Sequence, residues 1–160
     1  MNKIAVYPGT FDPVTRGHLD LVERASKIFD EVIVAVAKSS TKNVLFSTEE
    51  RVALIREATA DTPGVSVESF DGLLINYLEE HHADVFLRGL RAISDFEYEF
   101  QMASMNRKLA SKFETIFMMT GEQYTYLSSR FVKEICRLGG EVECFVHPVV
   151  KAALIEKFNL

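Results

Sequence analysis

The amino-acid sequence predicts an α/β fold: a doubly wound, parallel, five-stranded sheet with helices on both faces. Short apolar segments rich in β-branched residues alternate along the chain with longer segments of helical period. The short segments lack polar alternation, as expected for strands that are covered on both faces of a parallel sheet. In such sheets a ligand binds beyond the carboxyl ends of the strands, where the strand order reverses. Motifs that directly follow strands are therefore the candidates for function.

The expected strands are separated by enough residues for a crossover helix between each pair. They comprise residues 4–7, 32–37, 65–70, 85–87 and 115–119. The second of them is the longest apolar run. This spacing is typical of βαβ units in series, which favour right-handed connections.

Apolar stripes of helical period and helix-capping motifs indicate the helices between these strands. The apolar stripes are formed by Leu19, Val22, Ala25 and Phe29, and by Val52, Ile55 and Ala58 or Thr59. Ser47 with Glu50, and Ser94 with Glu97, have the spacing of a capping box at a helix start. A further helix is expected to begin near Ser128 and to end at Gly139, and the last one to begin at Pro148.

Length, charge and cysteine content exclude several classes of protein. At 160 residues the chain matches a single domain, residues 1–160, which can bury roughly 70% of its unfolded surface without disulfides. The net charge of −5 argues against binding long nucleic acid, because that affinity comes from neutralising many phosphates. No apolar run could span a bilayer, and Pro8 interrupts the N-terminus before a signal peptide forms. We therefore expect a soluble, cytoplasmic protein without nucleic-acid or membrane partners.

The loop after the first strand is the first candidate for chemistry. Residues 7–18 hold two prolines and two glycines, which predict a rigid loop that a ligand can approach closely at Gly9 and Gly17. His18 falls in the first turn of the next helix, where unpaired amides favour an anion. Neither a Walker motif nor a G-x-G-x-x-G motif is present. Taken alone, His18 could simply cap its helix.

Cations and hydroxyls follow the other strands. Arg88 and Arg91 flank a short turn after the fourth strand and offer forked donors to phosphate oxygens, or they form salt bridges with acidic residues of the next helix: Asp95, Glu97 or Glu99. Lys42 follows the second strand, and Ser128 and Ser129 follow the fifth. We expect these loops to converge on one site of polyphosphate size.

Methionine and cysteine side chains are expected to be structural. Met102, Met105, Met118 and Met119 are predicted to lie in the core or to line a pocket. Cys136 and Cys144 are too few for a disulfide framework, and both are predicted to be small buried apolar residues.

Three motifs together resemble a known enzyme family. The loop at residues 9–13, leading to Thr15-x-Gly17-His18, is similar to the T/H-x-G-H signature of nucleotidyltransferases. Arg88-Gly89-Leu90-Arg91, followed by Asp95-Phe96-Glu97-Tyr98-Glu99, and Ser128-Ser129-x-x-Val132-Lys133-Glu134 resemble the bacterial phosphopantetheine adenylyltransferases. The resemblance extends from Met1 to about Phe158 and implies a Rossmann-like nucleotidyltransferase fold.

The resemblance implies a reaction of ATP, with Mg²⁺, and 4′-phosphopantetheine that yields dephospho-coenzyme A and pyrophosphate in coenzyme A biosynthesis. The implied catalytic residues are His18, Thr10 and Lys42. The implied ATP-binding residues are Thr10, Phe11, His18, Gly89, Leu90, Arg91, Glu99, Tyr124, Thr125, Tyr126, Leu127, Ser128, Ser129 and Arg130. The implied substrate-binding residues are Thr10, Lys42, Leu74, Arg88, Met102, Met105 and Asn106. No residue is implied as a metal ligand. A homohexamer, built as a dimer of trimers, and feedback binding of coenzyme A are implied as well.

The chain departs from this family at a few positions. Arg16 stands where Asn is common, and Arg130 stands where a third hydroxyl residue usually follows the serines. Thr120 and Gly121 replace a commoner Pro-Ser.

Two alternative functions stay open: a small nucleotidyltransferase for another acceptor, such as a nicotinamide or glycerol phosphate, and a nucleotide-binding regulatory module without catalysis. The two arginines and the acidic-aromatic segment after them favour the phosphopantetheine enzyme.

Overall fold

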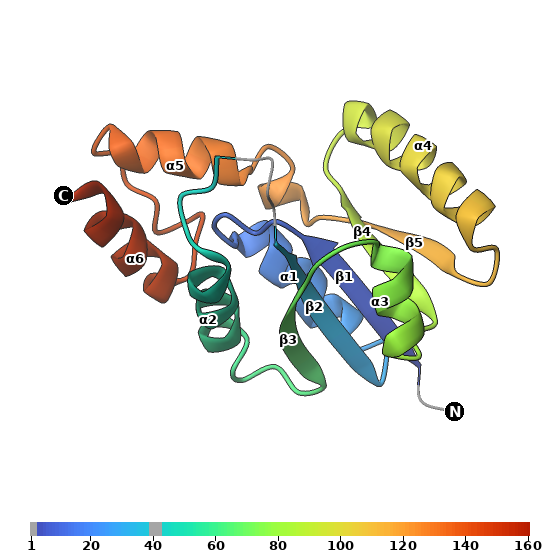
Figure 1. Ribbon diagram of the computed structural model, residues 1–160. Coiled ribbons are helices and arrows are strands. Elements are labelled where there is room, and N and C mark those ends of the chain that lie inside the picture. The colour runs from blue at the N-terminus through green and yellow to red at the C-terminus, as the bar shows by residue number, and fades with distance from the viewer. Residues whose placement is uncertain (1–2, 39–42) are drawn as a thin grey trace.

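The described residues form a five-stranded parallel sheet in the order β3-β2-β1-β4-β5, so the predicted fold class is confirmed (Figure 1). The computed structural model describes residues 3–38 and 43–160. The strands are β1 (Ile4–Gly9), β2 (Glu31–Ala37), β3 (Val65–Phe70), β4 (Val85–Leu90) and β5 (Glu114–Met119). All expected strands are present, and β1 and β4 extend beyond the predicted ends because their last residues still pair with β2 and β5.

Helices connect the strands and complete the chain. They are α1 (Arg16–Ala25), α2 (Thr48–Ala58), α3 (Leu74–Glu80), α4 (Ile93–Leu109), α5 (Ser129–Arg137) and α6 (Pro148–Phe158), with a short 3-10 helix, η1 (Glu122–Tyr124). Ser47 and Glu50 form the predicted capping box of α2, Ser128 caps α5, and Pro148 is the first residue of α6. None of the helices in the described residues is long and apolar enough to cross a membrane.

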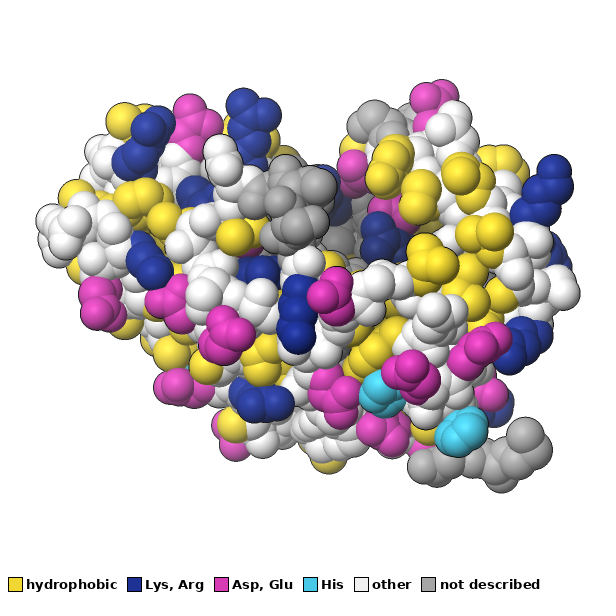
Figure 2. Space-filling model, viewed as in Figure 1, with side chains coloured by type: hydrophobic (Ala, Val, Ile, Leu, Met, Phe, Trp, Pro, Cys, Tyr) yellow, Lys and Arg dark blue, Asp and Glu magenta, His cyan; other side chains and the backbone are white. Residues whose placement is uncertain are grey.

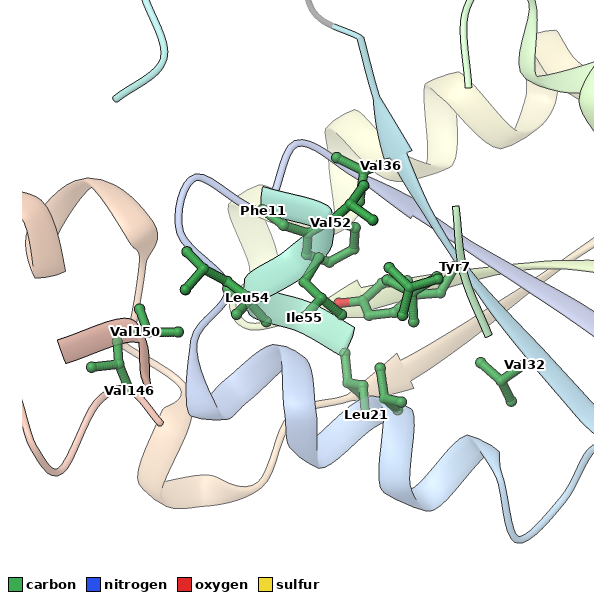
Figure 3. Packing of buried hydrophobic residues seen from close by; sticks show 14 of the residues in the cluster. Tyr7, Phe11, Leu21, Val32, Val36, Val52, Leu54, Ile55, Val146 and Val150 are labelled. Carbon is green, nitrogen blue, oxygen red and sulfur yellow. The ribbon is translucent and has the colours of Figure 1, made fainter. Parts of the chain in front are cut away.

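Different helices cover the two faces of the sheet, because successive strand residues point to opposite sides. Tyr7 of β1 joins the larger apolar cluster together with Leu21 of α1 and Ile55 of α2 (Figure 3). Its neighbour Val6 joins a smaller cluster with Leu78 of α3. The sheet is therefore buried on both faces, as its unbroken apolar strands predict.

Strands β1 and β4 separate toward their carboxyl ends. β1 pairs with β2 along its whole length, whereas its pairing with β4 is confined to Ala5 and Val6. Pro8 has no N–H to donate to a neighbouring strand, and its carbonyl oxygen accepts a hydrogen bond from Nη1 of Arg88 at 3.2 Å. The separation lies at the reversal of strand order, where a ligand site is expected.

The capping box predicted at Ser94 and Glu97 is wrong. α4 begins at Ile93, with Ala92 at the N-cap position and no capping hydrogen bond from a side chain. Ser94 is therefore the second residue of the helix and not its N-cap. The Asp95 carboxylate in the first turn accepts hydrogen bonds from the backbone N–H and the guanidinium of Arg91.

The burial predicted for Cys144 is also wrong. Cys136 is buried on α5 as expected, but Cys144 is exposed. Val142 and Val146 are both buried and lie at either end of a turn. Cys144 lies between them, on the solvent side of that turn.

α4 carries apolar side chains that the described part of the chain leaves exposed. Met102, Met105 and Met119 are exposed, contrary to the prediction that they lie in the core or line a pocket, whereas Met118 is buried. Met102 and Met105 lie on α4, where the described residues leave them exposed, and Met119 is the last residue of the strand β5. Figure 2 shows hydrophobic side chains gathered over α4.

Candidate active site

A cavity of about 650 Å³ opens where β1 and β4 separate. Its walls come from the ends of the strands β1, β2, β3 and β4 and from the N-terminal parts of the helices α1, α3, α4 and α5. The lining residues are 7–12, His18, Ala37, Asn43, Val44, Phe70, Leu74, Arg88, Gly89, Arg91, Asp95, Glu99, 128–130 and Lys133. The cavity is large enough for a nucleotide-sized ligand and lies at the predicted edge of the sheet.

The loop after β1 places His18 in the cavity wall. Thr15 caps α1 and forms a capping box in which the third helical residue is His18. The ring of Phe11 meets the His18 ring edge to face, with their centroids 5.1 Å apart. A Cβ atom at Gly9 would lie 2.8 Å from the Phe11 ring, so glycine is required where this ring folds back over the strand. Packing and capping together fix the histidine ring before a ligand binds.

The hydrogen bonds of His18 determine where its proton lies. The Thr15 backbone N–H donates to Nδ1 of His18 at 3.0 Å, so Nδ1 carries a lone pair and the neutral ring has its proton on Nε2. Burial, together with the charge of Arg91, lowers the pKa of His18 to about 4. At neutral pH the side chain is therefore an uncharged donor in the cavity wall, and it takes part in the capping box of α1 as well.

Both predicted arginines are oriented by carboxylates of α4. Glu99 accepts from Nε and Nη2 of Arg88 at 2.7 and 2.6 Å. Asp95 pairs with Arg91, and Nη1 of Arg91 also donates to the carbonyl oxygen of Leu127 at 2.9 Å. Burial lowers the pKa of Arg88, but the hydrogen bonds and charge of Glu99 outweigh burial and raise it. The predicted salt bridges are therefore present, and they hold cations that line the cavity.

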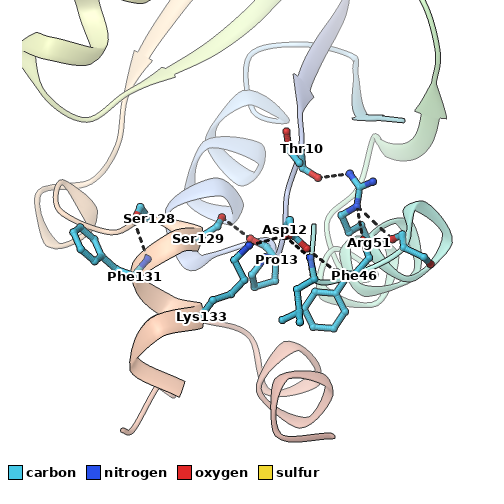
Figure 4. Close-up of polar contacts among 11 residues, drawn as sticks. Thr10, Asp12, Pro13, Phe46, Arg51, Ser128, Ser129, Phe131 and Lys133 are labelled. Atoms are coloured by element: carbon cyan, nitrogen blue, oxygen red, sulfur yellow. Dashed lines mark hydrogen bonds and ion pairs between the residues drawn. The ribbon is translucent and has the colours of Figure 1, made fainter. Parts of the chain in front are cut away.

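The first turn of α5 closes the other side of the cavity. Ser128 caps the helix by accepting from the Phe131 N–H, and the Ser129 hydroxyl donates to the Pro13 carbonyl oxygen at 2.7 Å. One turn further, Nζ of Lys133 forms an ion pair with Asp12 at 2.6 Å. Ser129 and Lys133 thus attach α5 to the loop after β1, while Ser128 caps the helix (Figure 4).

Asp12 is a structural residue of the site that the sequence did not predict. Its carboxylate is 6% exposed and accepts from the backbone N–H groups of Leu45 and Phe46, both at 2.9 Å, as well as from Lys133. It therefore joins three segments that are far apart in the sequence. The acidic residue in the Gly9–Pro13 motif was the signal, but its partners could not be known before the strands were placed side by side.

The cavity gathers many, but not all, of the predicted site residues. Those that line it are Thr10, Phe11, His18, Leu74, Arg88, Gly89, Arg91, Glu99, Ser128, Ser129 and Arg130. Those that do not line it are Leu90, Met102, Met105, Asn106, Tyr124, Thr125, Tyr126 and Leu127. Lys42 lies outside the described residues. Glu99 was expected on the ATP side, and here both of its oxygens contact Arg88.

The residues that depart from the family pattern lie in different places. Arg16 is directed away from the cavity, and its Nε donates to the carbonyl oxygen of Glu143 at 3.2 Å. Arg130 is exposed and lines the cavity. The Gly121 N–H donates to the carboxylate of Asp20 at 3.0 Å, which ties the loop after β5 to α1.

Comparisons with known proteins agree with this geometry. A family model described as cytidylyltransferase-like matches residues 6–135. The chain is 57% identical over 157 residues to the phosphopantetheine adenylyltransferase of Geotalea daltonii, which covers 98% of both chains.

Solved structures share the fold at low sequence identity. A putative nicotinate-nucleotide adenylyltransferase from Vibrio parahaemolyticus is 19% identical with a TM-score of 0.73, covering 98% of this chain and 93% of that one. The nicotinic acid mononucleotide adenylyltransferase of Plasmodium falciparum, complexed with NaAD, is 15% identical with a TM-score of 0.72, covering 100% of this chain and 97% of that one.

The lowered pKa of His18 predicts how stability depends on pH. The usual pKa is 6.5 and the folded-state value is about 4, so the unfolded chain takes up this proton first as the pH falls. The stabilisation from neutral His18 is complete above pH 6.5 and is lost between 6.5 and about 4. We therefore expect the wild type to lose more free energy of unfolding than His18→Gln across this interval, as measured by urea denaturation at a series of pH values. Parallel curves for the two proteins would contradict the neutral assignment.

Proposed function

The chain belongs to the phosphopantetheine adenylyltransferase family, and from this we propose that it transfers the adenylyl group of ATP to 4′-phosphopantetheine, giving dephospho-coenzyme A and pyrophosphate. The observation that carries the proposal is the identity of 57% over nearly the whole chain, combined with a cavity lined by the motif residues. The activity places the protein in coenzyme A biosynthesis.

The reaction requires positioning and charge stabilisation more than proton transfer. A phosphate oxygen of 4′-phosphopantetheine forms a bond to the α-phosphorus of ATP, and the bond from this phosphorus to the oxygen that bridges to the β-phosphorus breaks. The electron pair leaves with pyrophosphate. Because the attacking phosphate is already anionic, no general base is needed, and donors directed at the α-phosphoryl oxygens supply the catalysis.

His18 is the donor best suited to the transferred group. It lies in the first turn of α1, where the helix N-terminus favours an anion, and its proton is held on Nε2 by the bond from Thr15 to Nδ1. Among the described residues no partner takes the Nε2 proton, so it can reach a ligand oxygen. We propose that this N–H stabilises the charge that develops on the α-phosphoryl group.

Arg88 serves the acceptor phosphate. Of its five N–H groups, two donate to Glu99 and one to Pro8. Two N–H groups of Arg88 therefore remain for phosphate oxygens, and the Glu99 carboxylate already orients the guanidinium that carries them. Thr10 lines the same cavity, and we propose that it and Lys42 hold the acceptor phosphate with Arg88.

The ATP side is formed by α5 and the start of α4. The residues that line the cavity there are Arg91, Ser128, Ser129 and Arg130, and the N-terminus of α5 offers further backbone N–H groups to phosphate oxygens.

We propose that Mg²⁺ arrives bound to the ATP phosphates. The carboxylates that line the cavity, Asp12, Asp95 and Glu99, are each paired with a lysine or arginine, so the nucleotide rather than the chain would supply most ligands of the ion.

The proposal extends to the oligomeric state of the protein, its feedback regulation and its cellular location. The uncovered apolar side chains of α4 support a homohexamer, a dimer of trimers, in which another copy covers them. Coenzyme A would bind as a feedback ligand in the same cavity, because it contains the product of the reaction. Two free cysteines fit a cytoplasmic enzyme.

Pyrophosphate release tests the proposed function directly. Purified protein with ATP and Mg²⁺ is assayed without acceptor, with 4′-phosphopantetheine and with nicotinic acid mononucleotide. We expect release that depends on 4′-phosphopantetheine, with dephospho-coenzyme A as product. Release with the mononucleotide alone would assign another acceptor, and binding of ATP without release would favour the regulatory module.

Removal of the His18 side chain should reduce turnover and leave ATP binding largely intact. For His18→Ala we expect a loss of about 100-fold or more in kcat, because one donor to the developing charge is worth roughly 3 kcal/mol. The matched control is His147→Ala, since His147 caps α6 through its own Nδ1 outside the cavity. Full turnover by His18→Ala with normal ATP affinity would contradict the assigned role.

Removal of Arg88 should affect the two substrates unequally. We expect Arg88→Ala to raise the KM for 4′-phosphopantetheine by about 10-fold to 100-fold, since hydrogen bonds to charged groups contribute about 1.5–3 kcal/mol. The KM for ATP should change far less. Arg107→Ala is the control, because Arg107 forms an exposed ion pair with Glu114 away from the cavity. An unchanged KM for 4′-phosphopantetheine would refute the assignment.

A further inference from the structure

Arg51 on α2 is a buried cation for which the proposed reaction gives no reason. Its side chain is 1% exposed, the most deeply buried charged side chain among the described residues, and none of the described carboxylates forms an ion pair with it. A charge buried without an ionic partner is costly unless its donors are satisfied by well-placed acceptors. The acceptors around Arg51 show what the cation does.

Those acceptors come from segments that meet at the cavity. Nη1 donates to the carbonyl oxygen of Thr10, the residue after β1, at 2.7 Å (Figure 4). It also donates to the carbonyl oxygen of Ala37, the last residue of β2, at 3.0 Å. Nε is shared between the carbonyl oxygens of Phe46 and Ser47, at 3.2 and 3.3 Å. One planar guanidinium thus fixes the relative positions of three backbone segments.

A second group holds one of these segments from the opposite side. The N–H of Phe46 donates to Asp12, while the carbonyl oxygen of Phe46 accepts from Arg51. Phe46 itself is 2% exposed. Asn43 and Val44, which line the cavity, precede this doubly held residue by a few positions. Any displacement of Arg51 would therefore move the cavity wall beside Thr10.

We propose that Arg51 is a positioning residue for the acceptor phosphate. By fixing the end of β1 to the end of β2, it sets the place of Thr10 in the cavity that Arg88 also lines, without touching substrate itself. This inference rests on the proposed function, which assigns the acceptor phosphate to Thr10 and Arg88. Arg51 donates to none of the residues that form the ATP side on α5 and at the start of α4. Thr10, which the family resemblance also assigns to ATP, is the one residue shared by both sides, so ATP binding should respond less than acceptor binding to the loss of Arg51.

Two substitutions weaken this contact to different degrees. Arg51→Lys keeps the charge but cannot donate to all of the carbonyl oxygens at once. We expect it to raise the KM for 4′-phosphopantetheine by about tenfold and to leave the KM for ATP within about twofold, since small misplacements of binding groups have effects of this size. Thr48→Val removes just the hydroxyl that accepts from Nη2 at 3.1 Å. It should act in the same direction, by about two- to threefold.

The controls separate positioning from mere stability. Val52→Ala shortens a buried side chain on the same helix, so it should lower the Tm without changing the ratio of the two KM values. If Arg51→Lys does not fold, Thr48→Val carries the test.

Equal changes in both KM values, or none in either variant, would overturn the role of Arg51. The wild-type assay distinguishes this outcome from failure of the proposed function. Wild-type protein that releases no pyrophosphate with 4′-phosphopantetheine refutes the function, whereas active wild type with unaffected variants refutes the inference about Arg51 alone.

Discussion

The separation of β1 from β4 is the constraint on which the site depends. A parallel sheet wound in both directions must reverse at one strand, and here that strand is β1. Pro8 cannot donate to a neighbouring strand, and the pairing of β1 with β4 ends before it. The loops after these two strands therefore leave in different directions, and the cavity lies between them. The fold creates the space, and the residues at the strand ends give it its chemistry.

The groups in this space are oriented before any ligand binds. Thr15 determines the tautomer of His18, Glu99 holds Arg88, and the backbone carbonyl oxygens hold Arg51. Donors that are already aligned need no reorganisation as charge develops on a phosphoryl group, which is the main source of catalysis when the nucleophile is itself an anion. A rigid sheet edge with internally paired charges is well suited to such a reaction.

The sequence predicted the fold better than it predicted the partners within the site. Apolar periodicity located all five strands, and strand-end motifs located His18 and Arg88, because these signals are local. The contacts of Asp12 and Arg51 were not predictable in this way, since their partners are distant in the sequence and meet once the sheet forms. The capping box at Ser94 was wrong because α4 begins at Ile93, earlier than the local motif indicates.

The protonation state of His18 is the most direct test of this account. The measurement is the ¹⁵N chemical shifts of the histidine ring nitrogens at neutral pH, with the His18 signals assigned by their loss in a variant at that position. A neutral ring with its proton on Nε2 is the predicted result, since the Thr15 N–H occupies Nδ1 and burial opposes the charge. A charged imidazolium, or a proton on Nδ1, would contradict the account.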